Sequence, residues 1–470
     1  MTITPSDASI ASSLRGAEHR VLWTDRPGAP DPTPPLAGRV RTDLLVIGGG
    51  LTGLWTAVEA LRREASRDVM LLEGDVVASG ASGRNGGFIA ESLTHGIAHG
   101  RDAWPTEMSD LLRLGRENLA EISDFLAAEG IDAHLRLAGK SVMAVLTHQV
   151  AGLAESHRLH LDAGEDSTLL DAEQMQADVS SPTYLGGLRV RSGGGTVDPA
   201  LLCWGLLRAA QARGAVVHEQ TPVTSLARGA DCIEVTTAHG VVEAQRVVLG
   251  TNAFPPLLAR LRNWILPVYD HVLVTEPLTP HQRESIGWRE EQGLTDAGNQ
   301  FHYYRLTPDG RILWGGYDAV YHFGGRGPES VQARDQSFRT LAAHFLDTFP
   351  QLEGVHFTHR WYGAIDTTSR FTPLFGTAFG GRLSYAVGYT GLGVGASRFG
   401  ARTALDLVDG VTSERTALEL VRRHPVPFPP EPVRYPLIRV TQAALAREDR
   451  TGHRSAYLRL LDRFGVGFNS

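Results

Sequence analysis

The beginning of the chain alternates between short apolar runs and an amphipathic segment. Residues 43–47 and 68–72 are apolar runs as long as a buried parallel strand. Residues 51–64, between them, place apolar side chains at helical spacing: Leu51, Leu54, Trp55, Val58 and Leu61. The pattern predicts a strand, a helix and a second strand parallel to the first.

The same patterns predict most later elements. Helices are expected over residues 107–130 (an amphipathic pair that ends at Gly130), 149–178, 198–213, 330–347, about 436–449 and 455–463, and up to residue 410 after a glycine-rich turn. Strands are expected over residues 215–218, 231–237, 241–250, 268–275, 301–306, 311–316 and 384–388. Asp198 and Pro199 are typical of a helix N-cap and first turn. His239-Gly240 indicates a hairpin turn, and no internal repeat is visible.

Length and composition indicate an ordinary globular protein of two or three domain-sized units. The chain has 470 residues, of which 42% are hydrophobic and 21% charged. The net charge is -7, lysine is nearly absent, and arginines are scattered along the chain. Because no basic stripe is present, a nucleic-acid partner is not expected.

The expected compartment follows from sequence features. The N-terminus has no charged segment followed by an apolar run, so we expect no secretory signal. No window reaches the about 18 apolar residues of a membrane span. Cys203 and Cys232 are too few for a disulfide framework or a zinc site. We therefore expect a cytoplasmic protein without a membrane span, with residues 24–38 as a proline-rich, extended lead-in.

A glycine-rich loop follows the first predicted strand and opens the first predicted helix. The first glycine allows a tight turn, the second lets the backbone approach a pyrophosphate, and the third lets helix and strand pack closely. The phosphates then lie at a helix N-terminus, where free N–H groups and the helix dipole favour anions. The loop therefore predicts a dinucleotide site with Gly48, Gly50, Leu51, Thr52 and Gly53.

An acidic residue at the end of the second strand sharpens this prediction. Glu73 lies about twenty residues after Gly53, where a carboxylate would bind a ribose diol. Gly74 and Asp75 follow, and no arginine is present to bind a 2′-phosphate, which disfavours NADP. This fingerprint alone leaves both NAD and FAD open.

A second glycine-rich loop, residues 79–87, favours FAD. Its sequence is SGASGRNGG. A nicotinamide dehydrogenase usually continues into another helix at this point, whereas a flavin enzyme must bring backbone close to the isoalloxazine ring. Glycines interleaved with Ser82, Arg84 and Asn85 supply close approach and hydrogen-bond donors.

These two loops resemble those of a known family. The stretches VIGGGLTGLWTA and LLEGDVVASGASGRNGGF look like the D-amino-acid oxidase, glycine oxidase and sarcosine oxidase family. The form ASGRNGGF most resembles its gamma-glutamylputrescine oxidase-like branch. Further segments are similar too: residues 192–226, 246–254, 360–376 and 385–400. The resemblance covers most of residues 20–425.

The resemblance implies which residues hold FAD. Val223 stands where the family makes a backbone contact to adenine. The N–H groups at the start of the last long helix would lie near the flavin pyrimidine ring, where a helix N-terminus stabilises negative charge. The implied set beyond the first loop is Glu73, Gly74, Ser82, Arg84, Asn85, Gly86, Val223, Gly250, Thr251, Asn252, Gly363, Tyr389, Gly391, Leu392, Gly393 and Val394.

The resemblance also implies the fold. We expect an α/β protein with an FAD-binding, Rossmann-like domain of three layers (ββα) and a second, antiparallel-sheet α+β domain that binds substrate. The expected segments are an N-terminal extension (1–40), the discontinuous FAD-binding domain (41–100, 192–260 and 360–425), the substrate-binding domain (101–191 and 261–359) and a C-terminal helical tail (426–470). The tail either packs on the FAD domain or mediates self-association, so a homo-oligomer stays open.

The implied activity is oxidation of the C–N bond of a small amine or amino acid, by an oxidase or a dehydrogenase. A hydride moves from the carbon next to nitrogen to flavin N5, the imine is hydrolysed, and O2 or another acceptor reoxidises the flavin. Two alternatives stay open: a flavoprotein whose FAD is structural, serving as a binding or assembly module, and an NAD-linked dehydrogenase.

Four side chains are candidates for the substrate site. Asp366, in a flavin-edge segment, would bind a cationic amine, and Arg305 would pair with a substrate carboxylate. Tyr304 lies on the strand expected over the flavin, and His271 lies on the strand 268–275. Each also fits a structural role. No histidine motif typical of a metal site occurs, so no metal is expected.

FAD is expected to be non-covalent. Some relatives attach it through a cysteine in a C-terminal flavin-edge segment, and residues 360–400 contain no cysteine.

Overall fold

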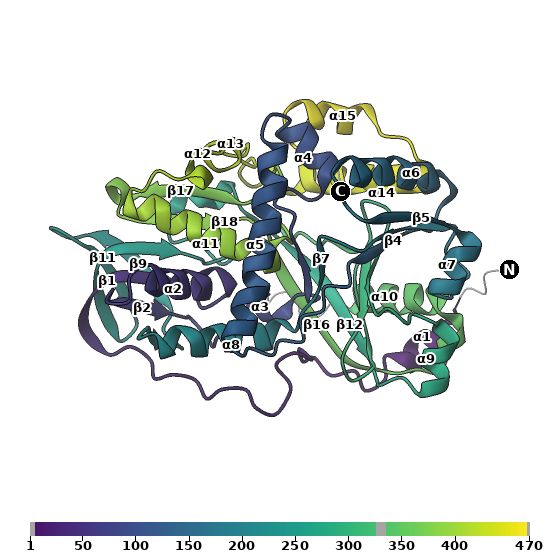
Figure 1. The fold of residues 1–470 in the computed structure, drawn as a ribbon, viewed down its shortest axis with the longest axis horizontal. Coiled ribbons are helices and arrows are strands. Elements are labelled where there is room, and N and C mark those ends of the chain that lie inside the picture. The colour runs from purple at the N-terminus through teal and green to yellow at the C-terminus, as the bar shows by residue number, and fades with distance from the viewer. Residues whose placement is uncertain (1–4, 326–334, 468–470) are drawn as a thin grey trace.

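Residues 5–325 and 335–467 are described by the computed structural model, and two eight-stranded sheets organise them (Figure 1). The order in the first sheet is β17-β18-β11-β1-β2-β8, with β10 and β9 extending from β11. Its strands are β1 (Gly38–Ile47), β2 (Val69–Leu72), β8 (Val216–His218), β9 (Val223–Arg228), β10 (Ile233–Thr237), β11 (Gly240–Leu249), β17 (Leu374–Ala378) and β18 (Leu383–Val387). Because β1 pairs in parallel with β2 and β11, and β11 with β18, distant segments form one parallel core.

Helices pack on this sheet. They are α2 (Leu51–Arg63), α8 (Pro199–Ala212) and α11 (Gly393–Asp409), and α5 (Met108–Ala128) packs on α11. Trp55 of α2 meets Phe125 of α5 edge to face, with ring centroids 5.1 Å apart. Asp198 caps α8, as expected, because its carboxylate accepts N–H bonds from Ala200 and Leu201. The apolar faces of these helices share one core with the strands.

The second sheet is mostly antiparallel, in the order β16-β12-β15-β14-β13-β4-β6-β5. Its strands are β4 (Lys140–Ala144), β5 (Ser167–Asp171), β6 (Gly186–Val190), β12 (Leu266–Thr275), β13 (Gly293–Asp296), β14 (His302–Leu306), β15 (Ile312–Gly316) and β16 (Phe357–Thr367). One face packs against α10 (Asp335–Thr348), where Trp314, Phe338 and Phe345 form an apolar core. The other face borders a cavity.

Shorter elements connect the sheets, and two helices form the tail. The connecting elements are α1 (Asp7–Ser13), α3 (Ala81–Arg84), β3 (Phe88–Ala90), α4 (Ile97–Ala103), α6 (Thr147–Asp162), α7 (Ala172–Asp178), β7 (Gly194–Thr196), α9 (Pro280–Ile286), α12 (Glu414–Ala417) and α13 (Glu419–Arg422). The tail comprises α14 (Arg434–Thr451) and α15 (Ala456–Arg463). Within the described residues, no helix is long and apolar enough to cross a membrane. A cytoplasmic location and a homo-oligomer stay predictions.

Most predicted elements are confirmed, two differ, and one lies partly outside the described residues. Residues 107–130 contain one helix, α5, which continues through Gly115. A Cβ at Gly115 would lie 2.1 Å from the carbonyl oxygen of Glu91, so glycine fits this point of the helix. Residues 149–178 contain β5 between α6 and α7, since that strand pairs with β6. Residues 330–334 of the helix expected over 330–347 lie outside the described part, and the remainder forms α10.

The two sheets fit the expected α/β fold class, and they place two segments differently from the expected domains. β16 pairs along its length with β12, so the boundary expected at residue 360 falls inside a strand of the second sheet. α5, expected in the substrate domain, packs on α11, where the side-chain amide of Asn118 donates to the carbonyl of Gly395 (2.8 Å). The rest of the domain division stays a prediction.

Candidate active site

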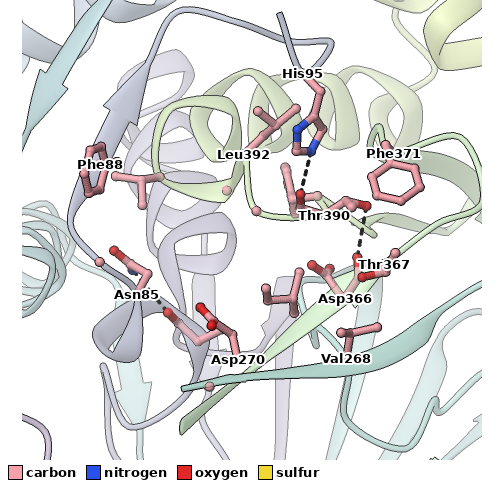
Figure 2. Close-up of a pocket in the computed structure, with 18 of the residues that line it drawn as sticks. Asn85, Phe88, His95, Val268, Asp270, Asp366, Thr367, Phe371, Thr390 and Leu392 are labelled. Carbon is pink, nitrogen blue, oxygen red and sulfur yellow. Dashed lines mark hydrogen bonds between the residues drawn. The ribbon is translucent and has the colours of Figure 1, made fainter. Parts of the chain in front are cut away.

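A cavity of about 2050 Å³ lies between the end of the parallel core and one face of the second sheet. Small-molecule pockets are usually about 300–1,000 Å³, so this one has room for a dinucleotide and a second molecule. In Figure 2, Asn85 of the second glycine-rich loop, Asp270 and Asp366 of the second sheet, and Leu392 before α11 border the same space.

The first glycine loop has the geometry that a pyrophosphate site requires. Gly48 follows β1 with φ +108°, and a Cβ there would lie 2.6 Å from the carbonyl oxygen of Gly250. A Cβ at Gly53 would lie 1.8 Å from the carbonyl oxygen of Gly48, so only glycine lets α2 start this close to the strand. Gly48, Gly50, Leu51 and Thr52 line the cavity. Gly53 packs behind them, as its expected role demands.

Glu73 lies beside this loop, at the end of β2. Its Oε2 accepts the N–H of Gly49 (2.6 Å) and its Oε1 accepts the N–H of Asp75 (3.0 Å). Burial raises the pKa of its carboxyl, and these N–H bonds oppose that rise. The carboxylate is thus fixed next to the phosphate loop, where a ribose diol would lie.

The second glycine loop is tied to the first and to the second sheet. Ser82 Oγ accepts the N–H of Leu51 (2.9 Å). Arg84 donates to the carbonyls of Ser79 (2.6 Å) and Tyr362 (3.4 Å). The Asn85 amide donates to the carbonyls of Ala81 and Ser82 and accepts the N–H of Gly87. These side chains shape the loop so that its backbone borders the cavity.

The C-terminal segments complete the cavity wall. Tyr389 hydroxyl lies 3.0 Å from Thr52 Oγ1, which joins α2 to a segment 337 residues later. Gly391 has φ +93°, and α11 begins two residues after it. The other expected cofactor residues also line the cavity: Gly74, Gly86, Val223, Gly250, Thr251, Asn252, Gly363, Leu392, Gly393 and Val394. The structure thus brings together all the expected cofactor segments.

The family model described as FAD dependent oxidoreductase, or DAO, matches residues 43–407. This chain belongs to the DAO family of FAD-dependent oxidoreductases. The glycine cradle, the fixed carboxylate of Glu73 and the helix start at Gly393 fit FAD as the cofactor.

Similar proteins agree with this assignment. Gamma-glutamylputrescine oxidoreductase of Escherichia coli is 31% identical over 420 residues, covering 88% of this chain and 94% of that protein. The probable oxidoreductase OrdL of Haemophilus influenzae is 29% identical, covering 80% of this chain and 85% of its own. The solved glycine oxidase from Bacillus cereus shares the fold, with a TM-score of 0.66 at 20% identity over 82% of this chain and 99% of its own.

Asp270 offers a carboxylate to this cavity from the second sheet. It lies on β12, where Val268, Asp270 and Val272 line the cavity. Its carboxylate accepts the hydroxyl of Tyr303 and the N–H groups of His271 (2.8 Å) and Gly316 (3.1 Å). Burial raises the pKa of Asp270 to about 6, although these hydrogen bonds lower it. The carboxylate therefore titrates close to neutral pH.

Two of the expected substrate residues lie one position away from those that line the cavity. His271 follows Asp270 and turns to the opposite face of β12, where it meets the ring of Phe338. Tyr304 follows Tyr303, and its hydroxyl lies 2.8 Å from that of Tyr184. Neither His271 nor Tyr304 is among the lining residues. Successive strand residues face opposite sides, so the expected placement of both in the substrate site is wrong.

Arg305 is also placed away from the substrate. Its guanidinium donates to the carbonyls of Gly87 (2.9 Å) and Val197 (2.7 Å) and lies over the ring of Trp23. Burial lowers the pKa of this guanidinium to about 10. Arg305 therefore joins β14 to the second glycine loop, and the expectation that it faces a substrate carboxylate does not fit this placement.

Asp366 lines the cavity, as expected, and is buried at the end of β16. Its carboxylate accepts the N–H of Gly388, in the segment that leads to Gly391. Burial raises the pKa of Asp366 to about 7 against backbone hydrogen bonds that lower it. Asp366 thus both supports the flavin-edge turn and offers a carboxyl group to the cavity.

His95 was not a candidate from the sequence, because it lies in a loop without a recognisable motif. Its Nε2–H donates to the carbonyl of Thr390 (2.6 Å), and the ring faces the cavity (Figure 2). Burial lowers the pKa of His95 to about 4. This imidazole is therefore neutral at physiological pH and holds the turn before Gly391 in place.

The tail borders the outer part of the cavity. Leu437, Thr441 and Leu445 of α14 are lining residues. Asp449 anchors that helix, because its carboxylate accepts the N–H groups of Asn299 (2.9 Å) and Gln300 (2.8 Å). The sequence predicted these helices but gave no sign that they border the site.

Proposed function

We propose that this oxidoreductase oxidises the C–N bond of a small amine or amino acid. The observation that carries the proposal is the half-buried Asp270 carboxylate, held by Tyr303 on the sheet face that borders the cofactor segments. A carboxylate binds an ammonium group by charge, and a pKa of about 6 suits a base that works near neutral pH. The amine-linked names of relatives, such as gamma-glutamylputrescine oxidoreductase, support the same chemistry.

When bound, FAD would supply the two-electron acceptor, at flavin N5, for a hydride from the carbon next to nitrogen, with O2 or another acceptor as the final oxidant. The residues of the chain prepare the amine for this transfer. The Asp270 carboxylate holds the substrate ammonium and accepts its proton, because only the neutral amine has the lone pair that assists the transfer. Tyr303 keeps the carboxylate oriented. Water hydrolyses the imine product to a carbonyl compound.

Two further features of the cavity fit the proposed amine oxidation. The helix start at Gly393 borders the cavity, and its backbone N–H groups and positive dipole end would stabilise negative charge on a bound flavin. Asp366 is proposed as a second carboxyl group near the amine. We also propose that FAD is held without a covalent bond, since neither Cys203 nor Cys232 lines the cavity.

A substrate panel tests the proposal. The holoprotein is mixed anaerobically with primary, secondary and N-methyl amines and with D- and L-amino acids, and the flavin absorbance is followed. We expect at least one amine to bleach the flavin and release a carbonyl product. A flavin that dithionite reduces but no member of the panel bleaches would favour the structural-FAD alternative.

A further inference from the structure

The tail helix α14 forms part of the cavity wall, although it lies beyond residue 407, where the match to the DAO family ends. Leu437, Thr441 and Leu445 are lining residues at intervals of four. Side chains four residues apart lie on the same face of a helix. This face of α14, with Ile438 beside it, is therefore turned toward the cavity.

Both ends of α14 are fixed to the rest of the chain. Arg434 begins the helix, and its guanidinium donates to the side-chain oxygen of Asn263 (2.7 Å), shortly before β12. At the other end, the Asp449 carboxylate accepts the N–H groups of Asn299 (2.9 Å) and Gln300 (2.8 Å). The helix is thus held in place as a wall of the cavity.

Polar groups on the inner side of α14 already have partners within the chain. The Thr441 hydroxyl donates to the carbonyl of Leu437 (2.9 Å) and lies 2.8 Å from the hydroxyl of Tyr457. The carboxylate of Glu448 is paired with Arg454 (2.8 Å). The surface that α14 offers to a ligand is therefore mainly the surface of its leucine and isoleucine side chains.

A short segment connects this wall with the candidate base. The N–H of Gly316 donates to the Asp270 carboxylate (3.1 Å). Tyr317 and Ala319 follow, and both line the cavity. The side-chain amide of Gln442, on α14, donates to the carbonyl of Ala319. Three residues span at most about 11 Å, so one molecule held at Asp270 can reach the inner face of α14.

The segment opposite α14 adds aromatic surface. The ring of Tyr317 stacks on the ring of His302, with centroids 5.2 Å apart and planes 9° apart. The N–H of Tyr317 donates to the carbonyl of Phe301 (2.8 Å), which also lines the cavity. Aliphatic side chains on α14 and aromatic rings beside it thus border the outer part of the same cavity.

We propose that the space between α14 and residues 316–319 is a subsite for an alkyl chain of the amine substrate. The inference rests on the proposed amine oxidation and narrows its substrate to amines that carry an apolar chain. Asp270 holds the ammonium at one end of the molecule, and α14 contacts the chain at the other. Each methylene that leaves water stabilises the complex, so binding strengthens with chain length until the space is filled.

Matched substrates and variants test the subsite. The kinetics of n-alkylamines from propylamine to decylamine are compared with those of α,ω-diaminoalkanes of equal length, whose second ammonium would lose hydration in an apolar subsite. Calorimetry with n-alkanols of the same lengths measures binding to the oxidised holoprotein without turnover. The variants are Ile438→Ser and Leu437→Ser, on the inner face of α14, and Val440→Ser, an exposed control on the same helix.

We expect the wild-type kcat/KM to rise with chain length by up to about fourfold for each methylene, the value for a buried CH2 group. The monoamines should be preferred to the diamines. Ile438→Ser should lower the kcat/KM ratio of octylamine to propylamine by about fourfold or more, and weaken octanol binding by a similar factor. Leu437→Ser should act in the same direction, and Val440→Ser should keep the wild-type ratio. FAD content and circular dichroism establish that each variant is folded.

A wild-type kcat/KM that does not depend on chain length would overturn the subsite. An unchanged ratio in both folded inner-face variants, or an equal loss in Val440→Ser, would also overturn it. Flavin bleaching by amines without these length effects refutes the subsite alone and leaves amine oxidation standing. Alkanol binding that strengthens with length and weakens in Ile438→Ser, in a protein that no amine reduces, supports the subsite and refutes amine oxidation.

Discussion

The hydroxyl of Tyr303 donates a hydrogen bond to the carboxylate of Asp270, from β14 to β12 across β15. The pair faces the cavity where the flavin-edge segments meet the second sheet. A cavity-facing Cβ at Gly86 would lie 2.5 Å from the Tyr303 ring, so the second glycine loop fits directly against this pair. The relationship links the cofactor site to the candidate base.

Replacing Asp270 tests its role as the base. Asp270→Asn keeps the shape but removes the charge and the proton acceptor. We expect the rate of flavin reduction by the best amine to fall about 100-fold or more, as for other positioned bases. Anaerobic stopped-flow absorbance measures it. His271→Gln, one residue along on the opposite face, should keep the wild-type rate; an equal loss in both variants would contradict the assignment.

The pH dependence of flavin reduction follows from the pKa of Asp270. Burial raises it to about 6, so the carboxylate is protonated below that pH and ionised above it. The second-order rate constant for flavin reduction, which reports the free enzyme, should therefore rise as pH increases through about 6. Tyr303→Phe removes a hydrogen bond that lowers this pKa, so its profile should shift to higher pH.

Asp366 provides the control for that profile, because its pKa is about 7. If Asp270 is the base, Asp366→Asn should keep the inflection near 6. Loss of that inflection in Asp366→Asn, with retention in Asp270→Asn, would assign the base to Asp366.

The close approach of helix and strand at the phosphate loop predicts a severe effect of Gly53→Ala. The added Cβ would lie 1.8 Å from the carbonyl oxygen of Gly48, so either α2 or the loop must move. We expect a destabilisation of about 1–3 kcal/mol or more and a purified protein with little FAD, measured by the ratio of flavin to protein absorbance. Gly152→Ala, in a helix with open space around it, should keep full FAD content.

The positions of the two cysteines predict that FAD is released on denaturation. Cys203 is buried on α8, with Sγ 3.9 Å from the carbonyl of Ser82, and Cys232 precedes β10. Acid precipitation should leave the flavin in the supernatant, and the Cys203→Ser, Cys232→Ser double variant should bind FAD as the wild type does. Flavin that remains in the wild-type pellet would contradict non-covalent binding.

The hydrogen bonds of Asp449 predict that this residue stabilises the position of α14 in the tail. Asp449→Ala removes the acceptor for the N–H groups of Asn299 and Gln300, which should cost about 1–3 kcal/mol locally. Hydrogen exchange of α14 should become faster, whereas the exposed change Arg447→Ala should leave it as it is. Unchanged exchange in Asp449→Ala would show that other contacts hold the helix.

The cofactor half of the site was predictable because it depends on local backbone geometry. Gly48, Gly50 and Gly53 stand at fixed offsets, and each offset has its own steric reason. Helix capping by Asp198 was predictable for the same cause, since a carboxylate and the N–H groups that it accepts are neighbours in sequence. The resemblance added the distant segments, such as the turn before Val394, that no local pattern could join to the loop.

The candidate substrate-binding residues were not predictable, because they depend on which side chains of a strand point into the cavity. In β12, two valines, Val268 and Val272, share the cavity face with Asp270, so no alternation of polar and apolar residue types in the sequence distinguishes the face of Asp270 from that of His271. The same holds for Tyr303 and Tyr304 on β14, because α10 covers one face and the cavity wall lies on the other. Because the sequence did not show which residue of each pair faces the cavity, the prediction selected His271 and Tyr304 instead of Asp270 and Tyr303.

The most direct test of amine oxidation uses an amine deuterated at the carbon next to nitrogen. The holoprotein is mixed anaerobically with the best amine of the panel and with its deuterated form, and flavin bleaching and carbonyl product are measured together. We expect slower bleaching with the deuterated amine and one carbonyl molecule for each flavin reduced. A flavin that dithionite bleaches, but that stays oxidised with every amine and yields no carbonyl product, would contradict it.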